Sequence, residues 1–461
     1  MEDSKSTNPT RREFIKSSTR IAATSALAGI VLPHVHAAEN NTIRVALCGC
    51  GGRGTGAAQD ALDVKNGPIK LVAMGDVFEN RLKDSYRGLK RKYGDKIDVP
   101  EDRKFVGFDA YKNVVDSLDG DDVVIFATPP AFRWVHFTYA IEKGINVFME
   151  KPVTVDGPTT RRMLKLGEKS VEKNMKVGVG LMVRHCRARQ ALYERIQNGE
   201  IGDITMMRAY RMAGPMVGFA GPNPGRINDF MYQIQKFHSF IWASGGTFSD
   251  FYIHQVDENC WMKNAWPVKA QASGGRHFRD NAIDQNFDNY SVEYTFADGT
   301  KLFLYGRNMQ GCHDEFASYV HGTKAAAVVS ASAHHPGRCK IFKDHRIVRR
   351  GNEAWAFPQP EPNPYKMEWE DLIQAIREDL PYNEVKRGAE ASLVTSMGRM
   401  AAHTGQIISY DDILNSKHEF APGLNHVTEV SDPPVMKGAD GKYPVPMPGQ
   451  PGNRNREYGK A

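Results

Sequence analysis

The 461-residue sequence is poor in three features that each point to a particular class of protein. It has only six cysteines, too few for a disulfide framework, and Cys48 and Cys50 flank a single glycine, which is too close for relaxed disulfide geometry. No apolar run reaches the roughly 20 residues that span a bilayer. The net charge of +6 is spread along the chain, whereas nucleic-acid binding needs basic residues gathered on one face. We therefore expect neither a membrane span nor a nucleic-acid partner.

Potential metal ligands are also few. His334, His335, Cys339 and His345 lie within a short stretch, but their spacing matches no familiar zinc pattern. We predict no metal site and expect these residues to lie in a surface loop.

The first residues have the pattern of an export signal rather than of a folded domain. Arg11 and Arg12 followed by Phe14 are typical of a twin-arginine signal. A modestly apolar stretch, residues 21–33, and a small-residue cleavage site ending at Ala37 follow in the right order. We expect residues 1–37 to engage the twin-arginine export machinery and to be removed, which makes the mature protein periplasmic or otherwise exported. A disordered basic N-terminus is the alternative.

Residues 42–184 alternate short apolar runs with helical stretches. Apolar runs without internal polar alternation indicate a parallel sheet that is covered on both faces. The first run leads into Gly49-Cys50-Gly51-Gly52-Arg53-Gly54, which is followed by alanines at helical spacing. Such glycines allow a tight turn and let the backbone approach a pyrophosphate at the helix N-terminus. The pattern predicts a Rossmann dinucleotide-binding domain.

The nucleotide is predicted from one acidic residue. Asp76 ends the second apolar run, 22 residues after Gly54. A carboxylate there accepts hydrogen bonds from the ribose hydroxyls and repels a ribose phosphate. We therefore predict NAD, with NADP as the alternative.

The pattern changes beyond about residue 184. Apolar and polar residues alternate in 290–296, a turn follows at 297–300, and a second strand starts at 301, which predicts an antiparallel hairpin with one solvated face. Residues 421–461 are rich in proline and glycine. The predicted fold class is α/β: a Rossmann domain (42–184), then an α+β domain with an open, largely antiparallel sheet (185–420), and an extended or disordered C-terminal arm (421–461).

Glu150-Lys151-Pro152 directly follows an apolar run of the Rossmann pattern. Together with Thr128-Pro129-Pro130, residues 177–184 and residues 245–257, this tripeptide resembles the Gfo/Idh/MocA oxidoreductases, which are named for glucose-fructose oxidoreductase and inositol dehydrogenase. The resemblance runs from about residue 43 to residue 414. It implies a dinucleotide-dependent enzyme that acts on hydroxyl groups.

In that family the matching Lys, Asp and His form the catalytic group, which implies Lys151, Asp250 and His254 here. A carbinol releases hydride only as its hydroxyl loses a proton; a histidine is suited to accept that proton and a lysine to stabilise the alkoxide. A helix would place Asp250 and His254 on one face, where the carboxylate can orient the imidazole or bind a hydroxyl. We predict substrate contacts from Arg184, Tyr252, Asp250 and His254. The predicted cofactor-binding residues are Gly49, Gly51, Gly52, Arg53, Gly54, Asp76, Thr128, Pro129, Glu150 and Lys151.

These features predict an exported oxidoreductase that transfers a hydride between a carbohydrate or cyclitol hydroxyl and NAD. Because the twin-arginine route carries folded proteins and the periplasm has no nicotinamide pool, we expect NAD to be tightly held and recycled within each catalytic cycle. One alternative is a redox-neutral NAD-dependent glycosidase similar to the α-N-acetylgalactosaminidase branch. Another is a sugar-binding homologue without activity. We also expect a homo-oligomer.

Overall fold

The computed structural model describes residues 41–214, 220–277, 282–347, 351–450 and 457. The predicted signal, residues 1–37, lies outside these ranges. Within them, no helix is long and apolar enough to cross a membrane.

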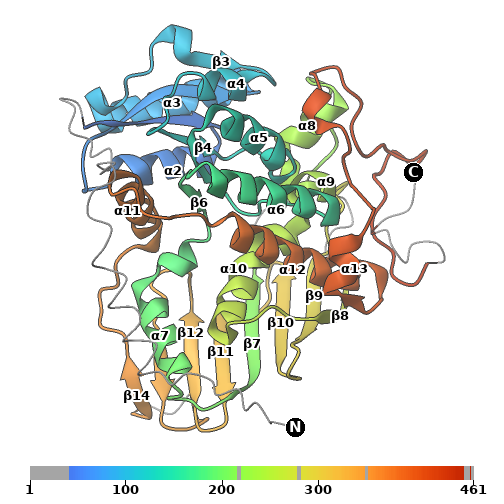
Figure 1. Ribbon diagram of the computed structural model, residues 1–461. Helices are drawn as coiled ribbons and strands as arrows, with labels where there is room; N and C mark the ends of the chain where they lie inside the picture. Colours follow the sequence, from blue (N-terminus) through green and yellow to red (C-terminus); the bar gives the residue numbers. More distant parts are fainter. Residues whose placement is uncertain (1–40, 215–219, 278–281, 348–350, 451–456, 458–461) are drawn as a thin grey trace, which may run out of the picture.

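Six parallel strands form the first sheet, in the order β3-β2-β1-β4-β5-β6 (Figure 1). This is the doubly wound order of nucleotide-binding domains, so the predicted Rossmann domain is confirmed. The inner strands β4 and β5 are buried at every position because helices cover both faces. The strands are β1 (Ile43–Cys48), β2 (Ile69–Asp76), β3 (Lys104–Val106), β4 (Val123–Phe126), β5 (Asn146–Met149) and β6 (Val177–Val179).

Five helices connect these strands, and the first begins inside the glycine-rich turn. Its position puts the helix N-terminus at the carboxyl end of the sheet, where open α/β folds bind ligands. The helices are α2 (Gly52–Leu62), α3 (Glu79–Tyr93), α4 (Ala110–Val115), α5 (Arg133–Lys143) and α6 (Gly157–Glu172).

Nine strands form the second sheet, in the order β14-β13-β12-β11-β7-β10-β9-β8-β15. Its neighbours pair antiparallel except β7 and β10, which confirms the predicted open, largely antiparallel sheet. The expected hairpin is β9–β10, with Tyr294 opposite Leu302. The strands are β7 (Ile204–Ala213), β8 (Lys269–Gly275), β9 (Asn289–Thr295), β10 (Lys301–Asn308), β11 (Glu315–Gly322), β12 (Ala326–Ala331), β13 (Lys340–Phe342), β14 (Glu353–Ala356) and β15 (Ile408–Ser409).

Helices cover one face of this sheet and connect it to the first domain (Figure 1). The long helices α10 and α12 pack on the strands, and α12 also contacts α6. Helix α11, which the sequence placed in the second domain, packs on the Rossmann sheet: Trp369 stacks on Phe148 of β5 with 4.5 Å between ring centroids. The helices are α7 (Arg187–Gln197), α8 (Asp229–Gln235), α9 (Ile241–Ser244), α10 (Gly246–Lys263), α11 (Pro364–Arg377), α12 (Val385–Thr404) and α13 (Tyr410–Asn415).

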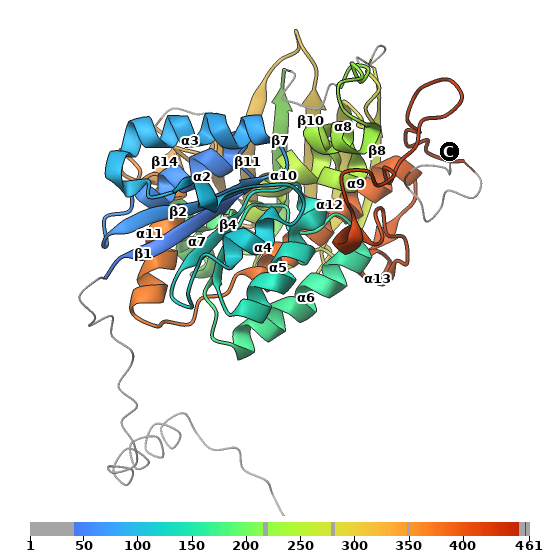
Figure 2. The same cartoon turned by 90° about the horizontal axis from the view of Figure 1, so that it is seen from above.

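The described part of the C-terminal arm lies against the body of the protein, beside α9 and α13 (Figure 2). Tyr443 is buried, its ring packs edge-on against Phe240, and its hydroxyl donates to Asp229 at 2.5 Å. Further along, both carboxylate oxygens of Glu457 accept from Arg399 at 2.7 Å, and both side chains are fully buried. Tyr443 and Glu457 therefore attach the described part of the arm to the fold.

The buried Arg399–Glu457 pair gives a stability prediction. Glu457→Ala leaves the Arg399 guanidinium buried without its anion, so we expect the free energy of unfolding to fall by about 3–5 kcal/mol. Denaturant unfolding of the purified protein measures this. Glu419→Ala is the matched control, because its partner Arg162 is 41% exposed and such pairs contribute about 1 kcal/mol or less. Equal losses in the two variants would mean that Glu457 does not anchor the arm.

Candidate active site

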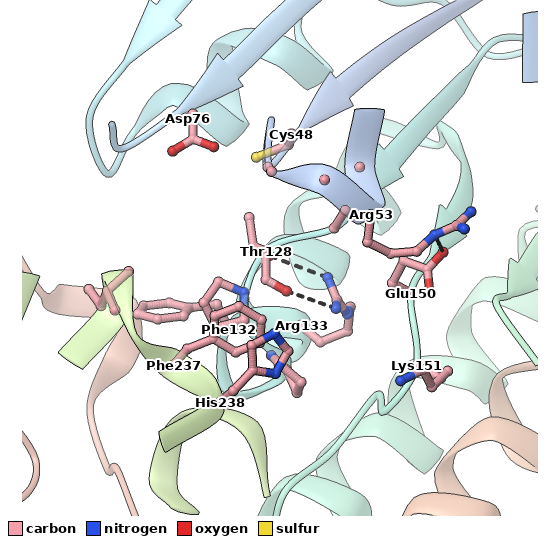
Figure 3. A pocket seen from close by; sticks show the side chains of 18 of the residues that line it. Cys48, Arg53, Asp76, Thr128, Phe132, Arg133, Glu150, Lys151, Phe237 and His238 are labelled. Carbon is pink, nitrogen blue, oxygen red and sulfur yellow. Dashed lines mark hydrogen bonds and ion pairs between the residues drawn. The ribbon is translucent and has the colours of Figure 1, made fainter. Parts of the chain in front are cut away.

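A cavity of about 450 Å³ lies between the carboxyl ends of the first sheet and helix α10. Figure 3 shows Cys48 and Asp76 at one end of it and Lys151 and His238 at the other. Most of the predicted site residues line this cavity: Gly49, Gly51, Gly52, Arg53, Gly54, Asp76, Thr128, Pro129, Glu150, Lys151, Asp250 and His254.

The glycine-rich turn has the geometry of a phosphate cradle. Gly49 has a φ of +97°, and a Cβ on Gly54 would lie 1.9 Å from the carbonyl oxygen of Gly49, so both positions require glycine. At Gly51 and Gly52 no atom of the described residues lies within 4 Å of the position that a Cβ would take, which leaves open space at the N-terminus of α2. The free N–H groups and positive dipole of that helix end suit a pyrophosphate. The turn therefore fits a dinucleotide.

Asp76 ends β2 beside this cradle and is held by the backbone. Its two carboxylate oxygens accept from the N–H groups of Cys50 (2.7 Å) and Phe78 (2.8 Å). Burial raises the pKa of Asp76, and these two hydrogen bonds oppose that rise. The residue lines the cavity and is placed to bind the ribose hydroxyls of a nucleotide.

Asp76 also gives a prediction on nucleotide choice. Asp76→Ala removes the negative charge that repels a ribose phosphate, so we expect the NAD/NADP affinity ratio to fall by about tenfold or more. Titration of the nucleotide-free protein with both nucleotides measures the ratio. Asp98→Ala, which removes an exposed carboxylate outside the cavity, is the control. An unchanged ratio in Asp76→Ala would remove this residue from the ribose site.

An ion pair of Arg53 and the hydrogen bonds of Arg133 fix the walls around the cradle. Arg53 donates from Nε to Glu150 at 2.7 Å (Figure 3). Arg133 is fully buried and donates to the carbonyl oxygens of Phe126 and Thr128 at 2.7 and 3.0 Å. Arg133 thereby holds the loop after β4, which carries the predicted cofactor residues Thr128 and Pro129.

Lys151, Asp250 and His238 form a linked group at the other end of the cavity. Lys151 Nζ donates to the backbone oxygen of Asp250 at 2.5 Å and to its Oδ1 at 3.0 Å. Asp250 Oδ2 lies 2.5 Å from Nδ1 of His238, whose side chain is 33% exposed. Although burial opposes ionisation, Lys151 and His238 hold the pKa of Asp250 well below its usual range. Asp250 is therefore a carboxylate that orients His238 and Lys151 rather than His254.

His254 shares a face of α10 with Asp250 and is buried. Its ring meets that of His334 edge-on, 4.3 Å between centroids, and its Nδ1 has no hydrogen-bond partner among the described residues. Burial and the nearby charges of Lys151 and Arg211 hold the pKa of His254 well below its usual range. The imidazole is therefore neutral and able to accept a proton.

Two predicted substrate residues are not brought to the cavity. Tyr252 follows Asp250 by two residues, about 200° around a helix. Its ring therefore turns toward the sheet, where it is fully buried and lies against Gly306 of β10. Arg184 instead pairs with Asp257 through two hydrogen bonds of 2.9 and 2.7 Å. The predicted substrate contacts of Tyr252 and Arg184 are thus corrected to structural roles.

The cavity also contains residues that the sequence did not indicate. His238 had no spacing signal, and His334 was expected in a surface loop, whereas its ring lies inside the cavity against His254. For Arg211 the sequence offered one indication. It follows Met207 and Ala209 at the two-residue spacing of a strand, so it lies on the face of β7 where those two side chains are buried, which is an unusual place for a charge. Within the described ranges, no three His, Cys, Asp or Glu side chains gather to hold a metal ion.

The fold and the cavity define a two-domain α/β protein with a dinucleotide site between its domains. Residues 43–181 match the model of an oxidoreductase family with an NAD-binding Rossmann fold. The match covers the Rossmann domain and agrees there with the resemblance to the Gfo/Idh/MocA oxidoreductases.

Curated relatives are inositol dehydrogenases. Inositol 2-dehydrogenase of Corynebacterium glutamicum is 27% identical over 141 residues, which is 30% of this chain and 40% of that protein. The NAD(+)-dependent scyllo-inositol 2-dehydrogenase of Bacillus subtilis is 27% identical over 53% of this chain and 61% of its own length. The matched part thus spans less than two thirds of either relative.

Solved structures share the fold over 80% of this chain. Myo-inositol 2-dehydrogenase of Lactobacillus plantarum superposes with a TM-score of 0.59 at 21% identity and covers 80% of this chain and 99% of its own. Aldose-aldose oxidoreductase of Caulobacter crescentus has a TM-score of 0.60 at 16% identity, with the same coverage. At these identities the likeness shows the two-domain architecture.

Proposed function

We propose that this protein is an NAD-dependent oxidoreductase that transfers a hydride between NAD and a carbohydrate or cyclitol hydroxyl. One observation carries the proposal: a single cavity joins the glycine cradle and Asp76 to Lys151, Asp250 and His254. The inositol dehydrogenases among the relatives support the substrate class.

When bound, NAD supplies the acceptor for the hydride that leaves the carbinol carbon. His254 accepts the hydroxyl proton, because its imidazole is neutral and faces the cavity. Lys151 donates two of its three N–H groups to Asp250 and has one left for the substrate oxygen. Its positive charge stabilises the alkoxide that develops on that oxygen. Asp250 fixes the lysine in this position.

The lowered pKa of His254 predicts an unusual pH dependence. A histidine with an ordinary pKa of about 6.5 would lose about tenfold in its neutral fraction at pH 5.5. Because burial keeps His254 neutral below that range, we expect hydride transfer to change by less than about twofold between pH 7 and 5.5. Single-turnover rates on the NAD-loaded protein measure this. A tenfold decline would show that His254 is not the base.

The proposal extends to localisation and to tight cofactor binding. The twin-arginine pattern at Arg11 and Arg12 supports export as a folded, NAD-loaded protein. Arg11→Lys combined with Arg12→Lys should leave the protein folded in the cytoplasm. Export of the double variant, or purification of an exported protein free of nucleotide, would contradict this part.

We propose that two or more copies of the protein associate through the face of the second sheet that the helices leave uncovered. Tyr210 and Tyr305 stack there at 5.6 Å between ring centroids, and Tyr319 meets Tyr210 edge-on. Tyr305 is 39% exposed, so a partner would cover apolar surface. Analytical ultracentrifugation of the wild type and of Tyr305→Glu tests this; a wild-type monomer would exclude it.

The experiment that tests the enzymatic proposal uses the purified protein as it is exported. Denaturation releases any bound nucleotide for identification, and a panel of sugars, cyclitols and aryl glycosides is then screened for reduction of the bound NAD. We expect reduction by one of the sugars or cyclitols. Release of aglycone from an aryl glycoside without net reduction would favour the glycosidase. Inactivity toward the whole panel would favour the sugar-binding homologue.

A further inference from the structure

Arg211 is a cation without an anion at the substrate end of the cavity. It lies near the end of β7, opposite Phe316 of β11, and its guanidinium covers the Phe316 ring at 4.2 Å. Its buried Nε has no hydrogen-bond partner among the described residues, and no described carboxylate forms an ion pair with it. A half-buried guanidinium in this state still has its N–H groups available for a ligand.

The groups that contact Arg211 add donors rather than negative charge, and the charge of Glu258, which acts on Arg211 beyond ion-pair distance, is already paired with Arg189. Phe316 also contacts the ring of His334, 4.6 Å between centroids, and His334 contacts His254. The three groups therefore form one continuous wall with Phe316. Burial together with Arg211 and other cations holds the pKa of His334 well below its usual range, so this imidazole is neutral and has one N–H to donate.

Among the described residues, the three carboxylates that line the cavity are already engaged. Asp250 binds Lys151 and His238, and Glu150 binds Arg53. Asp76 accepts from backbone N–H groups beside the glycine cradle. The charge of Arg211 is thus left for a molecule that enters the cavity, and a buried charge without a partner is unfavourable.

We propose that the substrate carries a carboxylate that pairs with Arg211, so that the enzyme acts on an acidic sugar of the uronate class rather than on a neutral one. This inference rests on the proposed function and names its substrate class. The fork of the guanidinium matches a carboxylate through two parallel hydrogen bonds, and the neighbouring His334 adds a donor. The backbone N–H groups of the glycine cradle at α2 are placed to bind the phosphates of NAD. Arg211 is therefore available to bind the substrate.

The test compares acids with their neutral parents on the NAD-loaded protein. The probes are D-glucuronate, D-galacturonate and D-mannuronate, each paired with the corresponding hexose, and the readouts are calorimetric binding and reduction of the bound NAD. In at least one pair we expect the acid to be preferred about 100-fold in kcat/KM. Arg211→Met should abolish that preference while NAD stays bound, and Arg211→Lys should keep part of it, because lysine retains the charge without the fork.

Arg195→Met is the matched control, because Arg195 pairs with Glu200 on the surface and does not line the cavity. It should leave the acid preference unchanged. Equal or better use of the neutral sugars by the wild type, or an acid preference that survives Arg211→Met, would overturn the proposal, as would failure of all three acids to bind. If only a neutral sugar reduces NAD, the proposed oxidoreductase function stands and the carboxylate proposal fails. If an acid binds but reduces no NAD, the carboxylate site is supported and the proposed function is not.

Discussion

His254→Ala is expected to slow hydride transfer to bound NAD by about 10²–10⁴-fold, because no other group then accepts the hydroxyl proton at that position. The nucleotide should still co-purify, since the glycine cradle is untouched. The measurement is the single-turnover rate with a confirmed substrate, combined with quantification of released NAD.

His321→Ala is the control for this variant. His321 lies on β11, where its Nε2 accepts from Arg208 at 3.1 Å, and it does not line the cavity. Its replacement should leave the rate within about twofold, as for surface changes outside the site. A near-normal rate in His254→Ala would assign proton transfer to another cavity imidazole, first of all to His238, whose Nδ1 faces Asp250.

Lys151→Met is expected to lower the rate by about 10²–10³-fold, because the positive charge that stabilises the alkoxide is lost. It also removes the charge that lowers the pKa of the buried Asp250 carboxylate most, so this pKa should rise. The single-turnover rate and the NAD content separate loss of chemistry from misplacement of the cofactor.

Lys176→Met is the matched control, because Lys176 also pairs with an aspartate, Asp379, but lies outside the cavity. Combining Lys151→Met with His254→Ala tests whether the two residues act as one unit. If they do, the double variant should be little slower than the slower single variant. Fully multiplicative effects would show that they act independently.

Local sequence patterns were sufficient to predict the nucleotide half of the site. The strand, the glycine turn and the helix are contiguous, so the spacing from Gly49 to Gly54 fixes their geometry, and Asp76 follows at the end of the next strand. Lys151 could be placed because it directly follows a buried strand of the same sheet, where parallel strands end at one edge.

The substrate half could be predicted only in part, because it is assembled from distant elements. Helical spacing brought Asp250 and His254 to one face, yet the same spacing turns Tyr252 away. His238, Arg211 and His334 come from a short turn, a strand and a loop far apart in the sequence. Only the pairing of β7 with β11 and the packing of α10 bring them together, and no local pattern encodes that pairing.

Deuterium transfer in a single turnover tests the central claim most directly. The NAD-loaded protein is mixed with a substrate deuterated at its carbinol carbons, quenched, and the released nucleotide is analysed by mass spectrometry. The account predicts NADH that carries one deuterium in the wild type and almost none in His254→Ala at the same time point. Product formed from the substrate while the nucleotide stays free of deuterium would contradict it.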